Sequence, residues 1–190
     1  MARSANQALV EMIMSTAHPA VPSTEIEEDQ PPTTPTPQPT ARPTLPAGVE
    51  TRTVKHVGLA LAVPRRWSDN DLRCGVPQSD TVVVGAPTVG PPGCTATRPL
   101  GVSEVVIDRL YGDYGALWMA AATEPITLPS GLSGLRGTST SAEGLPVTVW
   151  AFPTIDAIIV ATAADDGDAQ DLINGILTTS RETITRPGEV

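Results

Sequence analysis

Short apolar runs, separated by Gly, Pro and Asp, dominate the second part of this chain and are typical of β-strands joined by turns. Pro64 directly follows the first run and marks its end, because proline cannot donate to a strand ladder. The last three runs are joined by short connections and predict an antiparallel meander. The predicted strands cover residues 57–63, 81–84, 102–107, 135–140, 147–152 and 157–162.

An apolar stripe at helical spacing around Leu172 predicts a carboxy-terminal helix. Asp168 is its predicted cap, and the helix is expected to end near Thr183. We expect this helix to lie across the sheet and to cover alternate strand residues such as Val149 and Ile159.

A second, shorter helix is predicted over residues 116–122, within a segment, 111–122, whose pattern also fits a looped strand. Gly112 and Gly115 favour a break before that helix begins. A short turn of helix through Leu72 is expected over residues 68–72, with Ser68, Asp69 and Asn70 as possible caps.

This order of elements predicts an α+β fold, with a mainly antiparallel sheet of about six strands covered by the carboxy-terminal helix and the short second helix. We expect residues 49–186 to form a single domain with one core, followed by a tail at 187–190. Residues 19–48 are expected to be a disordered linker rich in Pro and Thr, because nine of the 20 prolines fall between Pro19 and Pro46. A spacer is the main interpretation of this linker, and a PxxP ligand for a peptide-binding module is the alternative.

Residues 1–18 are predicted to be a short helix or the remnant of a targeting segment whose true start lies upstream. Glu11 interrupts the apolar run there, and the run is shorter than the roughly 20 residues that a membrane span needs.

The two cysteines, Cys74 and Cys94, flank the predicted strand 81–84 with turn-forming residues on both sides. We expect them to form a disulfide, and a disulfide indicates an oxidising, extracytoplasmic compartment. The alternatives are a redox-active or metal-binding pair, or two free thiols in a cytosolic protein. No CxxC spacing is present, and His56 has no companion at ligand spacing, so no metal site is predicted.

Charge limits the partners, since the formal net charge is −9. An acidic surface repels nucleic acid and anionic lipid, so we expect a protein partner or a small apolar ligand, and membrane attachment only through an anchor missing from this chain. Lys55 is the only lysine among 12 basic residues, a bias typical of GC-rich bacteria such as actinobacteria.

Arg65, Arg66 and the adjacent Trp67 are the predicted contact residues for a ligand or partner, because paired guanidinium groups bind carboxylates and other anions. Trp67, Trp118 and Trp150 fit either core packing or the lining of a ligand groove. The acidic cluster Asp165, Asp166, Asp168 and Asp171 is interpreted as helix capping and solvation rather than a calcium loop, because it lacks EF-hand spacing.

No catalytic motif is present in the sequence. The segments GLSG and GTSTS do not match the spacing of a serine nucleophile, and His18 and His56 are the only histidines. Lys55 lacks the glycines of a phosphate loop. We therefore predict a protein that is not an enzyme and uses no cofactor. A hydrolase with carboxylates that meet only in the fold is the less favoured alternative.

The segments LALAVPRRW, GLRGTST, VTVWAFP, DAIIVATA and DAQDLINGILTTS together resemble the PsbP-like family and its actinobacterial exported lipoproteins of the LpqN type. This resemblance implies a PsbP-like sandwich in an exported or lumenal protein, tethered by a lipid or a membrane helix, with binding or assembly roles and no catalytic residues. The chain departs from that pattern because it has no lipobox cysteine. The predicted function is a non-catalytic extracytoplasmic binding or assembly module of a bacterial cell envelope. The alternative is the extracytoplasmic sensor domain of a membrane-spanning, anti-sigma-like regulator with a truncated amino terminus.

Overall fold

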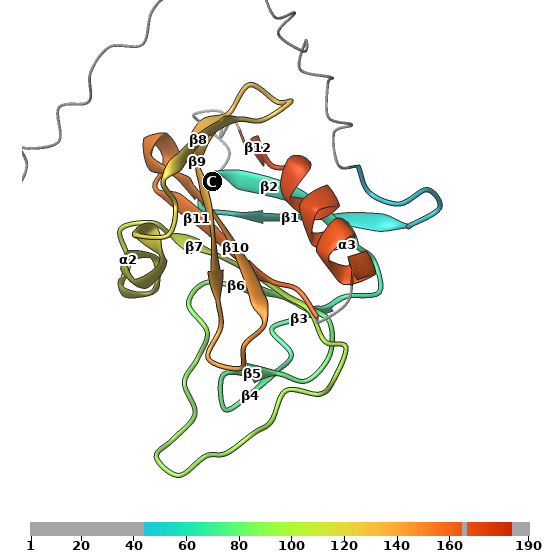
Figure 1. Cartoon of the computed structure of the whole chain (residues 1–190), viewed down its shortest axis with the longest axis vertical. Helices are drawn as coiled ribbons and strands as arrows, with labels where there is room; N and C mark the ends of the chain where they lie inside the picture. Colours follow the sequence, from blue (N-terminus) through green and yellow to red (C-terminus); the bar gives the residue numbers. More distant parts are fainter. Residues whose placement is uncertain (1–43, 165–166, 184–190) are drawn as a thin grey trace, which may run out of the picture. The chain divides into compact units, whose positions relative to one another are not determined.

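A seven-stranded mixed sheet forms the centre of the described structure (Figure 1). The computed structural model describes residues 44–164 and 167–183, so the predictions for 1–18, most of 19–48 and 187–190 lie outside the described residues. The strands follow one another across the sheet in the order β3 (Ser68–Asp69), β6 (Thr81–Val84), β7 (Glu104–Arg109), β11 (Ala157–Thr162), β10 (Pro146–Phe152), β9 (Ser133–Thr140) and β8 (Glu124–Thr127). The predicted α+β class is confirmed.

The predicted meander is confirmed, since β9, β10 and β11 pair antiparallel in sequence order. The sheet differs from the prediction in strand number, because β8 and the two-residue β3 add edges that the apolar pattern does not mark. It also differs in direction, because β3, β6 and β7 are parallel to one another. No helix makes the connection from β6 to β7. The disulfide-bonded loop over residues 85–103 makes it instead.

A separate three-stranded sheet lies beside the first, in the order β1 (Thr51–His56), β2 (Leu59–Pro64) and β12 (Arg181–Glu182). The predicted strand 57–63 is wrong at its start. Val57 and Gly58 have φ angles of 41° and 76° and form the two-residue turn between β1 and β2. Pro64 ends β2, as predicted.

Helix α3 (Gly167–Thr178) ends before the predicted Thr183, because residues 181–182 leave the helix to pair with β2. Asp168 lies inside its first turn, where a carboxylate interacts favourably with the helix dipole. The predicted turn of helix at 68–72 is wrong. Its residues contribute to β3 and to β4 (Leu72–Arg73), which forms a two-stranded hairpin with β5 (Val76–Pro77).

Helix α2 (Asp113–Met119) settles the ambiguous segment as a helix, three residues earlier than predicted. Gly115 is inside this helix rather than before it. A Cβ at Gly115 would collide with the carbonyl oxygens of Arg109 and Leu110, so glycine is needed here for close packing on the end of β7. A 3-10 helix over Pro153–Ile155 joins β10 to β11.

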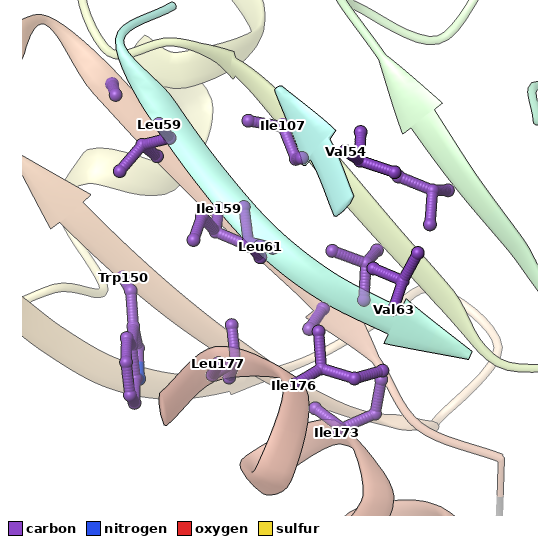
Figure 2. Packing of buried hydrophobic residues seen from close by; sticks show 14 of the residues in the cluster. Val54, Leu59, Leu61, Val63, Ile107, Trp150, Ile159, Ile173, Ile176 and Leu177 are labelled. Atoms are coloured by element: carbon purple, nitrogen blue, oxygen red, sulfur yellow. The ribbon is translucent and has the colours of Figure 1, made fainter. Parts of the chain in front are cut away.

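The core has two parts, one on each face of the large sheet. On the first face, β2 and α3 cover the sheet, and Figure 2 shows Leu61 of β2 with Ile159 behind it and Ile176 of α3 below. Val149 was expected under α3 together with Ile159, but it belongs to the opposite face. Directly paired residues of antiparallel strands point to the same face, and Val149 pairs with Val160.

Candidate functional site

A groove of about 490 Å³ lies where the segment before β1, the end of β2 and helix α3 meet. We call it the arginine groove. Its lining consists of Gly48, Val49, Glu50, Pro64, Arg65, Arg66 and Leu172. Val49, Pro64 and Leu172 give it an apolar surface, and Arg65 and Arg66 add two cationic groups. It therefore brings together two of the three predicted contact residues.

The third predicted contact residue, Trp67, is buried in the core beside the groove and is only 3% exposed. Its indole Nε1 has no hydrogen-bond partner among the described residues. Trp150 is also buried, in the same core cluster, and Trp118 packs half-buried against the opposite one. Trp67 and Trp150 are thus core residues, and neither lines the arginine groove.

The backbone around the two arginines is fixed on both sides. The Arg65 amide donates to the Glu50 carbonyl at 2.8 Å, which holds the end of β2 against the segment before β1. The Trp67 amide donates to the Pro64 carbonyl at 3.1 Å, which closes a turn. Arg52 donates from Nη2 to the Trp67 carbonyl at 3.0 Å. With Trp67 anchored inside, the turn leaves Arg65 and Arg66 exposed.

Electrostatically, the two arginines differ. The Nε of Arg65 lies 3.8 Å from Oε2 of Glu50, and both side chains are mostly exposed, so this contact contributes little free energy. Arg66 has no ion pair with any described residue. The arginine groove therefore presents uncompensated positive charge next to apolar surface.

The predicted disulfide is confirmed: Cys74 and Cys94 are bonded, with 5.6 Å between their Cα atoms. Cys74 lies in the β4–β5 turn with φ 55°, and Cys94 lies in the loop that follows β6. Gly90 is required at its position, because a Cβ there would come within 2.8 Å of the Cys94 sulfur. A second groove of about 460 Å³, lined by Asn70, Cys74, Val83 and Thr88 among others, separates this hairpin from β6.

A buried ion pair that the sequence did not reveal ties the same loop to the sheet. Arg98 Nη2 lies 3.1 Å from Oε2 of Glu104 on β7, and the two side chains are 9% and 10% exposed. Arg98 Nη1 also donates to the Val102 carbonyl at 3.3 Å. Within the part of the chain that the structure describes, Arg98 Nε and Glu104 Oε1 have no hydrogen-bond partner. A glutamate that begins an apolar strand carries no signal in sequence that it will be buried.

Burial raises the pKa of Glu104 above its ordinary value, and this effect outweighs the attraction of Arg98, which lowers it. Burial also raises the pKa of the Tyr114 hydroxyl on α2, with a further contribution from the charge of Glu104. Glu104 is thus paired with a cation and covered by the loop, an arrangement that holds structure in place rather than presenting a carboxylate to a substrate.

Within residues 44–164 and 167–183, no group of three or more His, Cys, Asp or Glu side chains is placed to hold a metal ion. Of the acidic cluster, Asp165 and Asp166 lie outside the described residues, and Asp168 and Asp171 are exposed on α3. In the same part of the chain, every helix is too short or too polar to cross a membrane.

Comparison with known proteins gives no match: no family model, no curated protein and no solved structure is significantly similar to this chain. Membership of the PsbP-like family therefore stays a prediction from the segments quoted above.

Proposed function

We propose that this domain is a non-catalytic extracytoplasmic binding module of a bacterial cell envelope, and that it binds an apolar group of a small ligand or partner protein in the arginine groove. The groove carries the proposal, because it combines apolar lining, fixed walls and two exposed guanidinium groups. Its volume of about 490 Å³ falls within the range of about 300–1,000 Å³ that is typical of small-molecule sites.

The compartment in this proposal follows from the disulfide. Disulfides persist in exported proteins and are reduced in most cytosols, so the Cys74–Cys94 bond is compatible with an extracytoplasmic location. Residues 19–48 serve in this proposal as the spacer that holds the module away from its anchor or partner, on the basis of their composition alone.

Titration of free thiols tests the compartment. In protein purified from its native host without reductant, we expect no reactive thiol before or after denaturation. Two reactive thiols under both conditions would contradict an extracytoplasmic role.

Mapping an apolar probe by NMR tests the binding site. In the full chain, we expect 1-octanol to shift the amide resonances of Val49, Glu50 and Leu172. The variant Leu172→Gln should weaken this binding, and the matched control Leu117→Gln, at a position that is 77% exposed on α2, should leave it unchanged. Octanol shifts centred on α2, or equal effects of the two variants, would contradict the proposal.

A further inference from the structure

We infer that the ligand of the arginine groove is a small amphipathic anion, with a carboxylate or similar group bound by Arg65 and Arg66 and an apolar body seated on Val49, Pro64 and Leu172. This inference rests on the proposed function and adds the charge of the ligand to it.

The first argument is that Arg66 has no carboxylate partner, whereas most other arginines among the described residues have one. Arg52, Arg98, Arg109 and Arg136 each have a carboxylate partner, from Asp69, Glu104, Asp156 and Glu124 respectively. Arg66 has none among the described residues, as is also true of Arg73 and Arg181, and Arg65 has a contact to Glu50 at 3.8 Å that is similar to the Arg109–Asp156 contact at 3.9 Å. In a chain of net charge −9, the two arginines face one carboxylate, Glu50, in the groove lining, so the groove keeps a local positive charge.

The second argument is how the arginines are positioned. Both follow directly from the end of β2, in a turn that the Arg65 amide and the buried Trp67 hold fixed. Guanidinium groups that start from a rigid backbone lose less entropy when they bind an anion, and they can donate two parallel hydrogen bonds to one carboxylate.

The third argument is the apolar part of the groove lining, which favours a small amphipathic ligand over a free inorganic anion. An inorganic anion would use the guanidinium groups and leave the half-buried apolar side chains of Val49 and Leu172 in water. A ligand with an apolar chain also buries that surface, at about 25 cal/mol for each Å² removed from water.

The experiment compares three probes of equal chain length by calorimetry on the full chain: octanoate, 1-octanol and octylammonium, each below its aggregation concentration. We expect octanoate to bind about tenfold more tightly than octanol, since one charge-assisted interaction of this kind corresponds to about one decade of affinity. Octylammonium should bind more weakly than octanol, because its charge is repelled by the arginines.

Two variants and a control locate the effect. Arg66→Gln and the double change Arg65→Gln with Arg66→Gln should reduce octanoate affinity to the level of octanol, with octanol binding unchanged. Arg181→Gln is the matched control, because Arg181 is another exposed arginine without an ion pair among the described residues and does not line the groove. All substituted positions are exposed and glutamine keeps a long polar side chain there, so we expect the variants to fold.

The outcomes separate this inference from the proposed function. Equal affinity for octanoate and octanol, or loss of octanoate binding in Arg181→Gln to the same degree as in Arg66→Gln, would overturn the anionic ligand and leave an apolar binding site in place. Failure of octanol to bind the groove at all would overturn the proposed function itself. Displacement of octanoate by acidic peptides at concentrations below that of octanoate would mean that the ligand is a protein segment and not a small molecule.

Discussion

The two faces of the seven-stranded sheet are closed in different ways. On the first face, regular elements cover the sheet: strand β2 and helix α3 contribute Leu61, Val63 and Ile176 to the same core cluster as Ile159 (Figure 2). On the second, the shorter helix α2, the segment that follows it and Leu72 of β4 pack against Val106, Ile158 and Val160.

The loop over residues 85–103 belongs to neither core cluster, and this difference explains why the domain contains a disulfide and a buried ion pair. A strand or a helix satisfies its own backbone hydrogen bonds and buries an apolar face, so packing alone holds it in place. A loop has fewer internal hydrogen bonds and less apolar surface, and here it is attached by Cys74–Cys94 and by Arg98–Glu104. The arginine groove lies at the margin of the first face, which β2 and α3 cover.

Adjacent isoleucines give the most direct comparison of the two faces, because Ile158 and Ile159 are both fully buried and point in opposite directions. We expect Ile159→Ala to lower the free energy of unfolding by about 4 kcal/mol and Ile158→Ala by about 2.5 kcal/mol, within the usual range for such truncations. Helix α2, which packs on the Ile158 face through the half-buried Tyr114 and Trp118, can shift into the cavity that Ile158→Ala leaves more easily than β2 and α3 can fill the cavity of Ile159→Ala. Urea denaturation measures both values, and a larger cost for Ile158→Ala would reverse the comparison.

Breaking the buried ion pair on one side should have the next largest effect. In Arg98→Met, Glu104 stays buried without its cation, and we expect a loss of about 3–4 kcal/mol at neutral pH. The double variant Arg98→Met with Glu104→Met removes both charges and should recover most of that loss. Thermal and urea unfolding of the wild type and the variants measure these differences in stability. A double variant no more stable than Arg98→Met would show that the ion pair itself contributes net stability.

Removing the disulfide should cost about 3 kcal/mol, as expected for a cross-link that closes a loop across a separation of 20 residues. We expect Cys74→Ser with Cys94→Ser to increase amide hydrogen exchange in the loop over residues 85–103, with little change in β2 and α3. Equal increases of amide hydrogen exchange in this loop and in β2 and α3 would mean that the disulfide stabilises the whole domain and not only the loop.

The smallest effect is a pH dependence from Glu104. Its pKa in the folded protein lies above the ordinary value of 4.5, because burial disfavours the charged form. The stabilisation from its protonated form is therefore complete below pH 4.5 and is lost as the pH rises through the folded pKa.

We accordingly expect the stability of the wild type to fall relative to Glu104→Gln as the pH is raised from about 4 to 8. In Arg98→Met the fall should be steeper, because the attraction that lowers the pKa of Glu104 is gone. Unfolding curves recorded across this pH range measure the difference, and a constant difference would show that Glu104 titrates normally.

The sequence predicted the elements that have a strong local signal. Residues 81–84 and 157–162 were predicted as strands with the observed bounds, because β-branched runs between turn residues leave few alternatives. The disulfide was also predictable, since only two cysteines exist to pair. The elements that were missed have weak patterns. The β1 sequence TRTVKH is mostly polar, and β3 and β12 contain two residues each.

The candidate site was predicted in part. Two adjacent arginines after a strand are visible in sequence, but their groove needs Val49 and Leu172, which are more than 100 residues apart in the chain. Helix or strand periodicity assigns a face to a residue only relative to its own element. The placement of Val149 opposite α3 followed from strand register, which the pattern alone did not fix.

By itself, the sequence determined the α+β class, the meander, the carboxy-terminal helix and the covalent link, because each depends on local propensity or on a unique pair of residues. Only the tertiary structure decided that β6 and β7 run parallel, that Arg98 and Glu104 meet under a loop, and that a groove forms beside Arg66. These features arise from contacts between segments distant in the chain, and their free energies depend on burial and register that local patterns do not encode.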